Sequence, residues 1–119
     1  MSLYKNLTVW QKSMDLVLAV YRLTEKLPRE ELYCLGSQLR RAVISIPSNI
    51  AEGNARQSSK EYRHFLCIAR GSNSEVETQL EICLRLGYCE AMEVKTAFEM
   101  CNEVGKMLSA IIKKLTTTT

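Results

Sequence analysis

Apolar residues recur at helical spacing along almost the whole chain. Four stretches keep the three- and four-residue spacing of an amphipathic α-helix, at residues 8–27, 37–53, 59–86 and 90–115. Short polar segments with glycine or proline separate them, and short links between helices favour antiparallel neighbours. The pattern therefore predicts an all-α fold, an up-down-up-down antiparallel four-helix bundle, as one domain over residues 1–119.

Each predicted helix has a seam of apolar residues for the bundle core. In the first helix the seam is Trp10, Met14, Val17, Tyr21 and Thr24 with Val20 on the same side, and Leu16, Leu23 and Leu27 widen it. The second seam is Leu39, Ala42, Val43, Ile46 and Ile50. The third is Tyr62, Phe65, Leu66, Ala69, Asn73, Val76, Leu80, Cys83 and Leu84. The fourth is Val94, Ala97, Phe98, Cys101, Val104, Gly105, Leu108, Ile111, Ile112 and Leu115.

Two helix starts carry a capping-box pattern, in which a hydroxyl residue precedes Gln or Glu by three positions. Thr8 with Gln11 predicts a cap for the first helix, and Ser58 with Glu61 predicts one for the third. In each case the hydroxyl should accept from the later backbone amide while the later side chain reaches back.

The helix ends are marked by proline and glycine. Pro28 stops the first helix, because the residue before a proline disfavours helical geometry. Gly53 or Asn54 is expected to take the left-handed conformation that closes the second helix, and Gly87 is expected to stop the third. Lys113 and Lys114 suit the negative end of the fourth helix dipole.

Pro47 lies in the interior of the second predicted helix. A proline there lacks an N–H and crowds the carbonyl of Val43, at a cost of about 3 kcal/mol. One interpretation is a kink that bends the helix around the core, with Ser45, Ser48 and Asn49 bonding the disturbed backbone locally. The other is that the freed carbonyl takes a partner from a neighbouring helix or subunit.

A second, partly apolar stripe lies opposite the seam of this helix. It comprises Arg40, Ile44, Pro47 and Ala51. A helix in a monomeric bundle needs one apolar stripe, so a second indicates deep burial or a contact between subunits. We therefore predict an oligomer interface at Ile44, Pro47 and Ala51.

Composition restricts the function classes. No apolar run approaches the roughly 20 residues that span a bilayer, and the first residues lack the apolar core of a signal peptide, so we expect a cytoplasmic protein without a membrane partner. The five cysteines contain no CxxC pair and there is one histidine, His64, so we expect reduced thiols and no metal site. No nucleophile–base constellation and no glycine-rich phosphate loop occurs, so we expect no catalytic residues, no cofactor and no enzyme activity.

Basic residues gather in the first part of the chain. Residues 1–70 hold eleven Lys and Arg against six Asp and Glu, whereas residues 71–119 hold five against seven. Lys60, Arg63 and Arg70 share one side of the third helix, beside its apolar seam. An ordinary solvated face, or neutralisation by the acidic half of a neighbouring subunit, explains such a stripe as well as a nucleic-acid contact does.

Several motifs resemble one family. They are Val9-Trp10-Gln11-Lys12, the run Leu39–Gly53 with Ser45-Ile46-Pro47 and Asn49-Ile50-Ala51-Glu52-Gly53, Ala69-Arg70-Gly71-Ser72, Glu75, Thr78-Gln79-Leu80 and Leu86-Gly87-Tyr88. Together they resemble the bacterial four-helix-bundle proteins encoded in intervening sequences of 23S rRNA genes, a family that includes the accessory variability protein of diversity-generating retroelements. The resemblance covers nearly the whole chain. It implies a ring, with a homopentamer as the expected state, no enzyme activity, no cofactor and a link to nucleic acid.

These observations lead to one main functional hypothesis. The chain is expected to be a non-enzymatic oligomer that binds RNA or DNA, or serves a nucleic-acid-processing partner such as a reverse transcriptase. The predicted nucleic-acid-binding residues are Arg40, Arg41, Arg56, Lys60, Arg63 and Arg70. The alternative is a protein-interaction scaffold with no nucleic-acid role; an enzyme is the third and weakest hypothesis.

Overall fold

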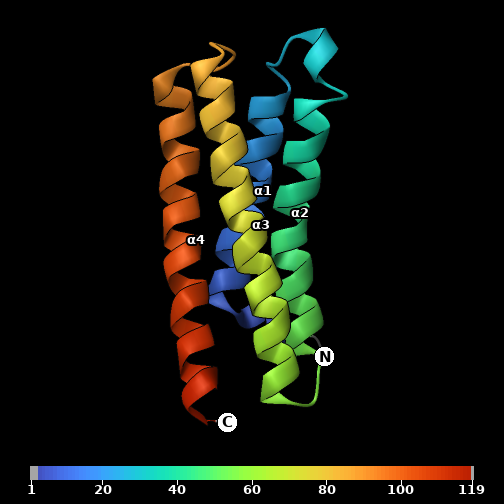
Figure 1. Ribbon diagram of the computed structural model, residues 1–119, viewed down its shortest axis with the longest axis vertical. Coiled ribbons are helices and arrows are strands. Elements are labelled where there is room, and N and C mark those ends of the chain that lie inside the picture. Colours follow the sequence, from blue (N-terminus) through green and yellow to red (C-terminus); the bar gives the residue numbers. More distant parts are fainter. Residues whose placement is uncertain (1–2, 119) are drawn as a thin grey trace.

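The chain folds into four long helices (Figure 1). The computed structural model describes residues 3–118, with side chains as far as Thr116. The helices are α1 (Thr8–Thr24), α2 (Leu35–Asn54), α3 (Ser59–Arg85) and α4 (Ala91–Thr118), with short 3₁₀ turns η1 (Leu3–Asn6) and η2 (Arg29–Glu31). No strand occurs within this range, and the sequence boundaries agree with the observed ones to within three residues.

Within the subunit, each helix packs against the helices that precede and follow it in the chain, and the last packs against the first. α1 packs on α2, α2 on α3, α3 on α4, and α4 back on α1. In Figure 1, α3 lies in front of α1, with α4 and α2 to either side, and successive helices run in opposite directions. The bundle measures 46 × 23 × 20 Å. The prediction of an all-α, up-down-up-down four-helix bundle is confirmed.

The core agrees with the predicted seams in three helices and differs in α1. In α2, α3 and α4 the seam residues are buried or half-buried. In α1, Met14 and Tyr21 are 38% and 36% exposed, whereas Leu16, Val20 and Leu23 of the predicted seam are buried together with Val9, as is Leu27 beyond the end of the helix. Ser13 completes that line: it is fully buried, and its hydroxyl donates to the carbonyl of Trp10 at 2.7 Å. Because this core position is polar, the apolar pattern did not identify it.

The two predicted caps have different outcomes. The Thr8 cap is wrong: the cap position is Leu7, no side chain caps it, and Gln11 Nε2 donates instead to the carbonyl of Lys5 at 2.9 Å. The Ser58 cap is confirmed by the Glu61 amide, which donates to Ser58 Oγ at 3.1 Å. The Glu61 carboxylate accepts from the Ser58 hydroxyl at 3.3 Å rather than from its backbone amide.

The glycines at the helix ends have different physical roles. Gly87 takes a positive φ of 77° and the Tyr88 amide donates to the carbonyl of Cys83 at 2.9 Å, so the predicted glycine stop is confirmed. The left-handed cap predicted at Gly53 or Asn54 is wrong, because α2 continues in helical geometry through Asn54. A Cβ on Gly53 would lie 2.7 Å from the Cβ of Phe65, so this glycine allows α2 and α3 to approach closely.

Pro47 is buried inside α2, and neighbouring side chains bond the backbone around it. The Ser48 hydroxyl donates to the carbonyl of Ile44 at 2.8 Å, and the Asn49 amide donates to the carbonyl of Ser45 at 2.8 Å. The Ser45 hydroxyl instead bonds the hydroxyl of Ser72 at 2.8 Å and accepts from the Asn49 amide at 2.9 Å. Ser48 and Asn49 thus bond the backbone beside Pro47, but neither bond is to the Val43 carbonyl, so the two interpretations both stay open.

The predicted interface residues differ in accessibility. Pro47 is buried within its own subunit, Ala51 is half-buried and Ile44 is 43% exposed. Ile44 and Ala51 therefore offer the surface for the predicted contact between subunits, while Pro47 shapes the helix that presents them. The oligomeric state stays a prediction.

Candidate nucleic-acid interface

The six predicted basic residues lie in four places on the bundle, and Arg40 occupies the first. Its side chain is half-buried, and Nη2 donates to the carbonyl of Leu32 at 3.0 Å. A Cβ on Gly36 would lie 3.1 Å from Nη1, so the guanidinium packs over a glycine. Arg40 thus ties the start of α2 to the chain that follows η2, and its guanidinium is already engaged within the subunit.

Arg41 lies on the outer side of α2, facing α3. It is exposed and lines a shallow hollow of about 310 Å³ together with Ser45, Ser72 and Glu75. The hydroxyls of Ser45 and Ser72 join the two helices at 2.8 Å in the floor of this hollow. Arg41 forms no ion pair within residues 3–118, so its charge remains available to a ligand.

Arg56 and Lys60 lie together at the turn between α2 and α3. Arg56 forms an ion pair with Glu52 at 3.0 Å, and its guanidinium lies 4.9 Å from the centroid of the Phe65 ring. Lys60 is exposed and lines a hollow with Arg56 and Phe65. At this end of the bundle, Lys60 carries the accessible charge and Arg56 is held by neighbours on both sides.

Arg63 and Arg70 lie on α3, farther along the helix. Arg70 Nη1 donates to Ser109 Oγ of α4 at 3.4 Å, a long and weak bond. Arg63 precedes Arg70 by seven residues, about two helical turns, so both project from the same side of α3. Arg70 therefore lies on the side of α3 that faces α4, whereas Arg41 lies on α2, on the other side of α3.

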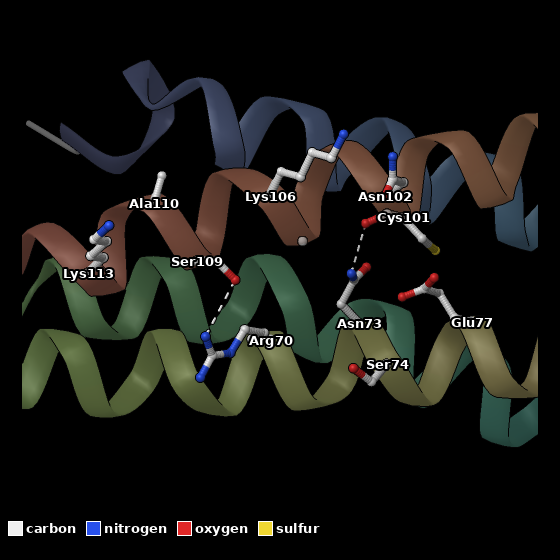
Figure 2. A pocket seen from close by; sticks show the side chains of 11 residues that line it. Arg70, Asn73, Ser74, Glu77, Cys101, Asn102, Lys106, Ser109, Ala110 and Lys113 are labelled. Atoms are coloured by element: carbon white, nitrogen blue, oxygen red, sulfur yellow. Dashed lines mark hydrogen bonds between the residues drawn. The ribbon is translucent and has the colours of Figure 1, made fainter.

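A groove between α3 and α4 contains Arg70 and adds cations that the sequence analysis did not assign to the site. This α3–α4 groove has a volume of about 560 Å³ (Figure 2). Its lining residues are Arg70, Asn73, Ser74 and Glu77 of α3 and Cys101, Asn102, Gly105, Lys106, Ser109, Ala110 and Lys113 of α4. The lining carries three basic side chains and one carboxylate, so the groove is net positive.

The groove floor holds a polar side chain that is only partly satisfied. Asn73 is 2% exposed, and its Nδ2 donates to the carbonyl of Cys101 at 2.9 Å (Figure 2). Its Oδ1 has no hydrogen-bond partner in the described part of the chain. Gly105 makes room for this contact, since a Cβ there would lie 3.1 Å from Asn73 Nδ2. A buried amide oxygen without a hydrogen-bond partner is uncommon in folded proteins, so Asn73 is an unusual residue in the lining of this groove.

Lys106 and Lys113 are the residues that sequence reasoning missed. Lys113 suited the helix dipole, and Lys106 stands beside the apolar seam at Gly105. Their seven-residue spacing repeats that of Arg63 and Arg70, and this matching period was the available signal. The spacing alone does not predict that α3 packs against α4, which places Arg70, Lys106 and Lys113 at the same groove.

The described residues offer little for catalysis or metal binding. Within residues 3–118 no three His, Cys, Asp or Glu side chains gather to hold a metal, and no helix there is long and apolar enough to cross a membrane. Burial raises the pKa of the Cys83 and Cys101 thiols to about 12, which keeps both protonated and poorly nucleophilic at neutral pH. His64 is exposed, with its ring edge-on to Phe65.

The fold and this basic groove define an all-α four-helix-bundle protein. The chain belongs to the family of 23S rRNA-intervening sequence proteins, whose pattern matches residues 5–110. The fold is also similar to the crystal structure of a protein of unknown function from the S23 ribosomal protein family of Bacteroides thetaiotaomicron. That similarity has a TM-score of 0.83 at 27% identity, and covers 89% of this chain and 99% of that one. No curated protein matches the chain. The family resemblance inferred from the sequence motifs is confirmed.

Proposed function

We propose that this protein is a non-enzymatic oligomer that binds the phosphate backbone of nucleic acid through the basic surface of α3. The surface comprises Lys60, Arg63 and Arg70, with Arg41 beside it on α2. The family membership supports a nucleic-acid setting. Arg40 and Arg56 contribute less, because their guanidiniums already have partners within the subunit.

The observation that carries the proposal is the lack of internal ion pairs on this surface. Four ion pairs form within residues 3–118: Lys12 with Glu103, Lys26 with Glu93, Arg56 with Glu52 and Arg85 with Glu81. None of them uses Arg41, Lys60, Arg63 or Arg70. A cation without an internal partner loses nothing when it neutralises a phosphate, and counterion release then favours binding.

Assembly would multiply this surface. A ring repeats the same cations once per subunit, so a strand held by one subunit meets the next at high effective concentration. Ile44 and Ala51 are the accessible residues of the proposed contact, and a homopentamer is the expected state. Light scattering tests this contact by comparing the molar mass of Ile44→Glu with that of Ile68→Glu. The control replaces a similarly exposed isoleucine on α3. A wild-type monomer at micromolar concentration refutes the assembly.

Charge reversal tests the binding surface. The variant Lys60→Glu, Arg63→Glu, Arg70→Glu should lose binding to RNA and DNA at low salt by at least about 100-fold, because three cations become repulsive. The matched control is Arg22→Glu, Arg29→Glu, Lys95→Glu, which changes the net charge equally where α1 ends and α4 begins (Figure 1). Light scattering and circular dichroism establish that both variants assemble and fold as the wild type does.

The outcomes separate the candidate functions. Loss of binding in the α3 variant alone supports the proposal. Equal binding by both variants shows that the α3 surface is not the site. If the wild type binds neither RNA nor DNA at low salt, the proposal fails and the protein-interaction scaffold becomes the better account. A cytoplasmic location and a reverse-transcriptase partner remain predictions.

A further inference from the structure

We propose that the α3–α4 groove seats a single strand of nucleic acid, with Lys106 and Lys113 of α4 holding the phosphates from the side opposite Arg70. This inference rests on the proposed function. It adds the second helix of the site and the kind of strand that the site accepts.

The first argument is that cations lie on both sides of the groove. Arg70 projects from α3, while Lys106 and Lys113 project from α4. In Figure 2 the Lys106 side chain extends away from α3, so its flexible stem must swing toward a bound strand for the ammonium group to reach a phosphate. Neither lysine forms an ion pair within residues 3–118. Arg70 holds only the Ser109 hydroxyl, at 3.4 Å. Because a guanidinium bonds a phosphate more strongly than a neutral hydroxyl, Arg70 can exchange this contact for a charge-assisted one without leaving a buried charge.

The second argument concerns width. The axes of packed helices lie about 8–10 Å apart, which sets the separation of the two sides of the groove. A whole duplex is wider than this, since its major groove alone measures about 12 Å across, so a duplex contacts only the outer surface of the two helices. A single strand is narrower and flexible, and positively charged grooves of this kind follow its backbone.

The third argument is the chemistry of the lining. Ser109 offers a hydroxyl among the three cations, Ser74 and Asn102 add polar groups nearer Glu77, and no aromatic residue lines the groove, as Figure 2 shows. Without an aromatic platform the bases have nothing to stack on, so recognition is directed to the backbone.

The charges also set where the strand lies. Glu77 occupies the part of the groove near Cys101, whereas Arg70, Lys106 and Lys113 occupy the rest, as Figure 2 shows. A phosphate backbone avoids the carboxylate and follows the cations toward the end of the bundle where α3 begins. That path continues to Arg63 and Lys60, so the groove and the α3 surface form one track.

The test measures binding of a fluorescent single-stranded oligonucleotide of about 20 residues, and of a duplex of the same length, to the full chain. In Lys106→Ala, Lys113→Ala two phosphate contacts are lost. At about 0.7 per phosphate on single strands, the log–log salt slope should fall in magnitude by about 1.4, and affinity at about 0.1 M salt should fall about 25-fold. The control Arg22→Ala, Lys95→Ala removes the same charge elsewhere and should change affinity less than threefold.

A neutral variant separates the groove from the general field of the protein. Ser109→Leu fills the groove from an exposed helical position without changing the charge, and should weaken single-strand binding about tenfold while duplex binding stays within twofold. If Ser109→Leu binds the single strand as the wild type does, or if the wild type prefers the duplex, the groove is not the seat of the strand.

The two proposals fail in different ways. If the wild type binds no nucleic acid, the proposed function itself is wrong. If the wild type binds, the α3 charge reversal abolishes binding and the Lys106, Lys113 variant equals its control, then the function stands and the α3–α4 groove is excluded.

Discussion

Replacing Gly53 by alanine should destabilise the bundle, although alanine is the better helix former. The Cβ of the new side chain would lie 2.7 Å from the Cβ of Phe65 and 3.0 Å from Cδ1 of Tyr62, distances that force α2 and α3 apart. Overpacking of this kind costs about 1–3 kcal/mol, against a helix-propensity gain of at most about 1 kcal/mol. The expected net loss is about 1–2 kcal/mol of unfolding free energy.

Gly71 supplies the matched control. It lies in the middle of α3 and is exposed, and a Cβ there would meet nothing within 4 Å. Gly71→Ala should therefore gain the propensity term alone and stabilise the protein by about 0.5–1 kcal/mol. The same substitution in two helices of one bundle thus has opposite expected signs.

Thermal unfolding followed by circular dichroism, at one fixed protein concentration, measures both changes. For a chain of this length about 4 °C corresponds to 1 kcal/mol, so Gly53→Ala should unfold about 4–8 °C below the wild type and Gly71→Ala about 2–4 °C above it. Two results would contradict this reasoning: both variants shifting in the same direction, or Gly53→Ala unfolding at the same temperature as the wild type. Either would show that the close approach of α2 and α3 does not require glycine at position 53.

Three further predictions concern single groups. Alkylation at pH 8 without denaturant should modify the two exposed thiols, Cys34 and Cys67, well before the three buried ones, and mass spectrometry showing equal rates would contradict the described burial. The Tyr88 hydroxyl donates to Glu31 at 3.0 Å, which raises the pKa of the phenol; this contribution to stability is present below the ordinary phenol pKa near 10.0 and is lost as the pH rises through the raised value. Ultraviolet titration of Glu31→Gln should give a lower midpoint for Tyr88, identified by its absence in Tyr88→Phe, and an unchanged midpoint would exclude the bond. Ser58→Ala should cost about 1 kcal/mol in chemical unfolding through loss of the α3 cap, whereas no loss would show that Ser58 does not cap the helix in solution.

Where the apolar pattern was continuous, it predicted the core. The seams of α2, α3 and α4 contain only apolar residues apart from Asn73 and Gly105, so their spacing located both the helices and their inner faces. In α1 a serine occupies a core position and satisfies its hydroxyl on the preceding turn, which no scale of hydrophobicity anticipates. Prediction failed where local hydrogen bonding replaced apolar character.

The glycines show the same limit at the level of single residues. Gly87 acts through its own backbone conformation, a local property that sequence can predict. Gly53 acts through the distance between two helices, which depends on how they pack. Both glycines were predicted to end a helix. Their different roles become clear only from the structure, in which Gly53 packs against Phe65.

The candidate site was predicted in part. Lys60, Arg63 and Arg70 follow from the face that they share on one helix, and helical geometry alone places them together. Arg40 was assigned by charge, whereas its guanidinium bonds a carbonyl from the preceding segment. Lys106 and Lys113 belong to the candidate site because α4 packs beside α3, which the sequence pattern of α4 alone does not reveal. The charge and spacing of residues on one helix can be predicted from the sequence, whereas a groove depends on how two helices pack together.

The salt dependence of wild-type binding tests the central claim most directly. Affinity for single strands of RNA and DNA, each in two unrelated sequences, should fall linearly on a log–log plot with a slope of about −0.7 per neutralised phosphate. With four or more cations in the track, the slope should be about −3 or steeper, and the four ligands should agree within about threefold because the contacts are to the backbone. A slope near zero, or a preference of about 100-fold for one sequence, would contradict the account.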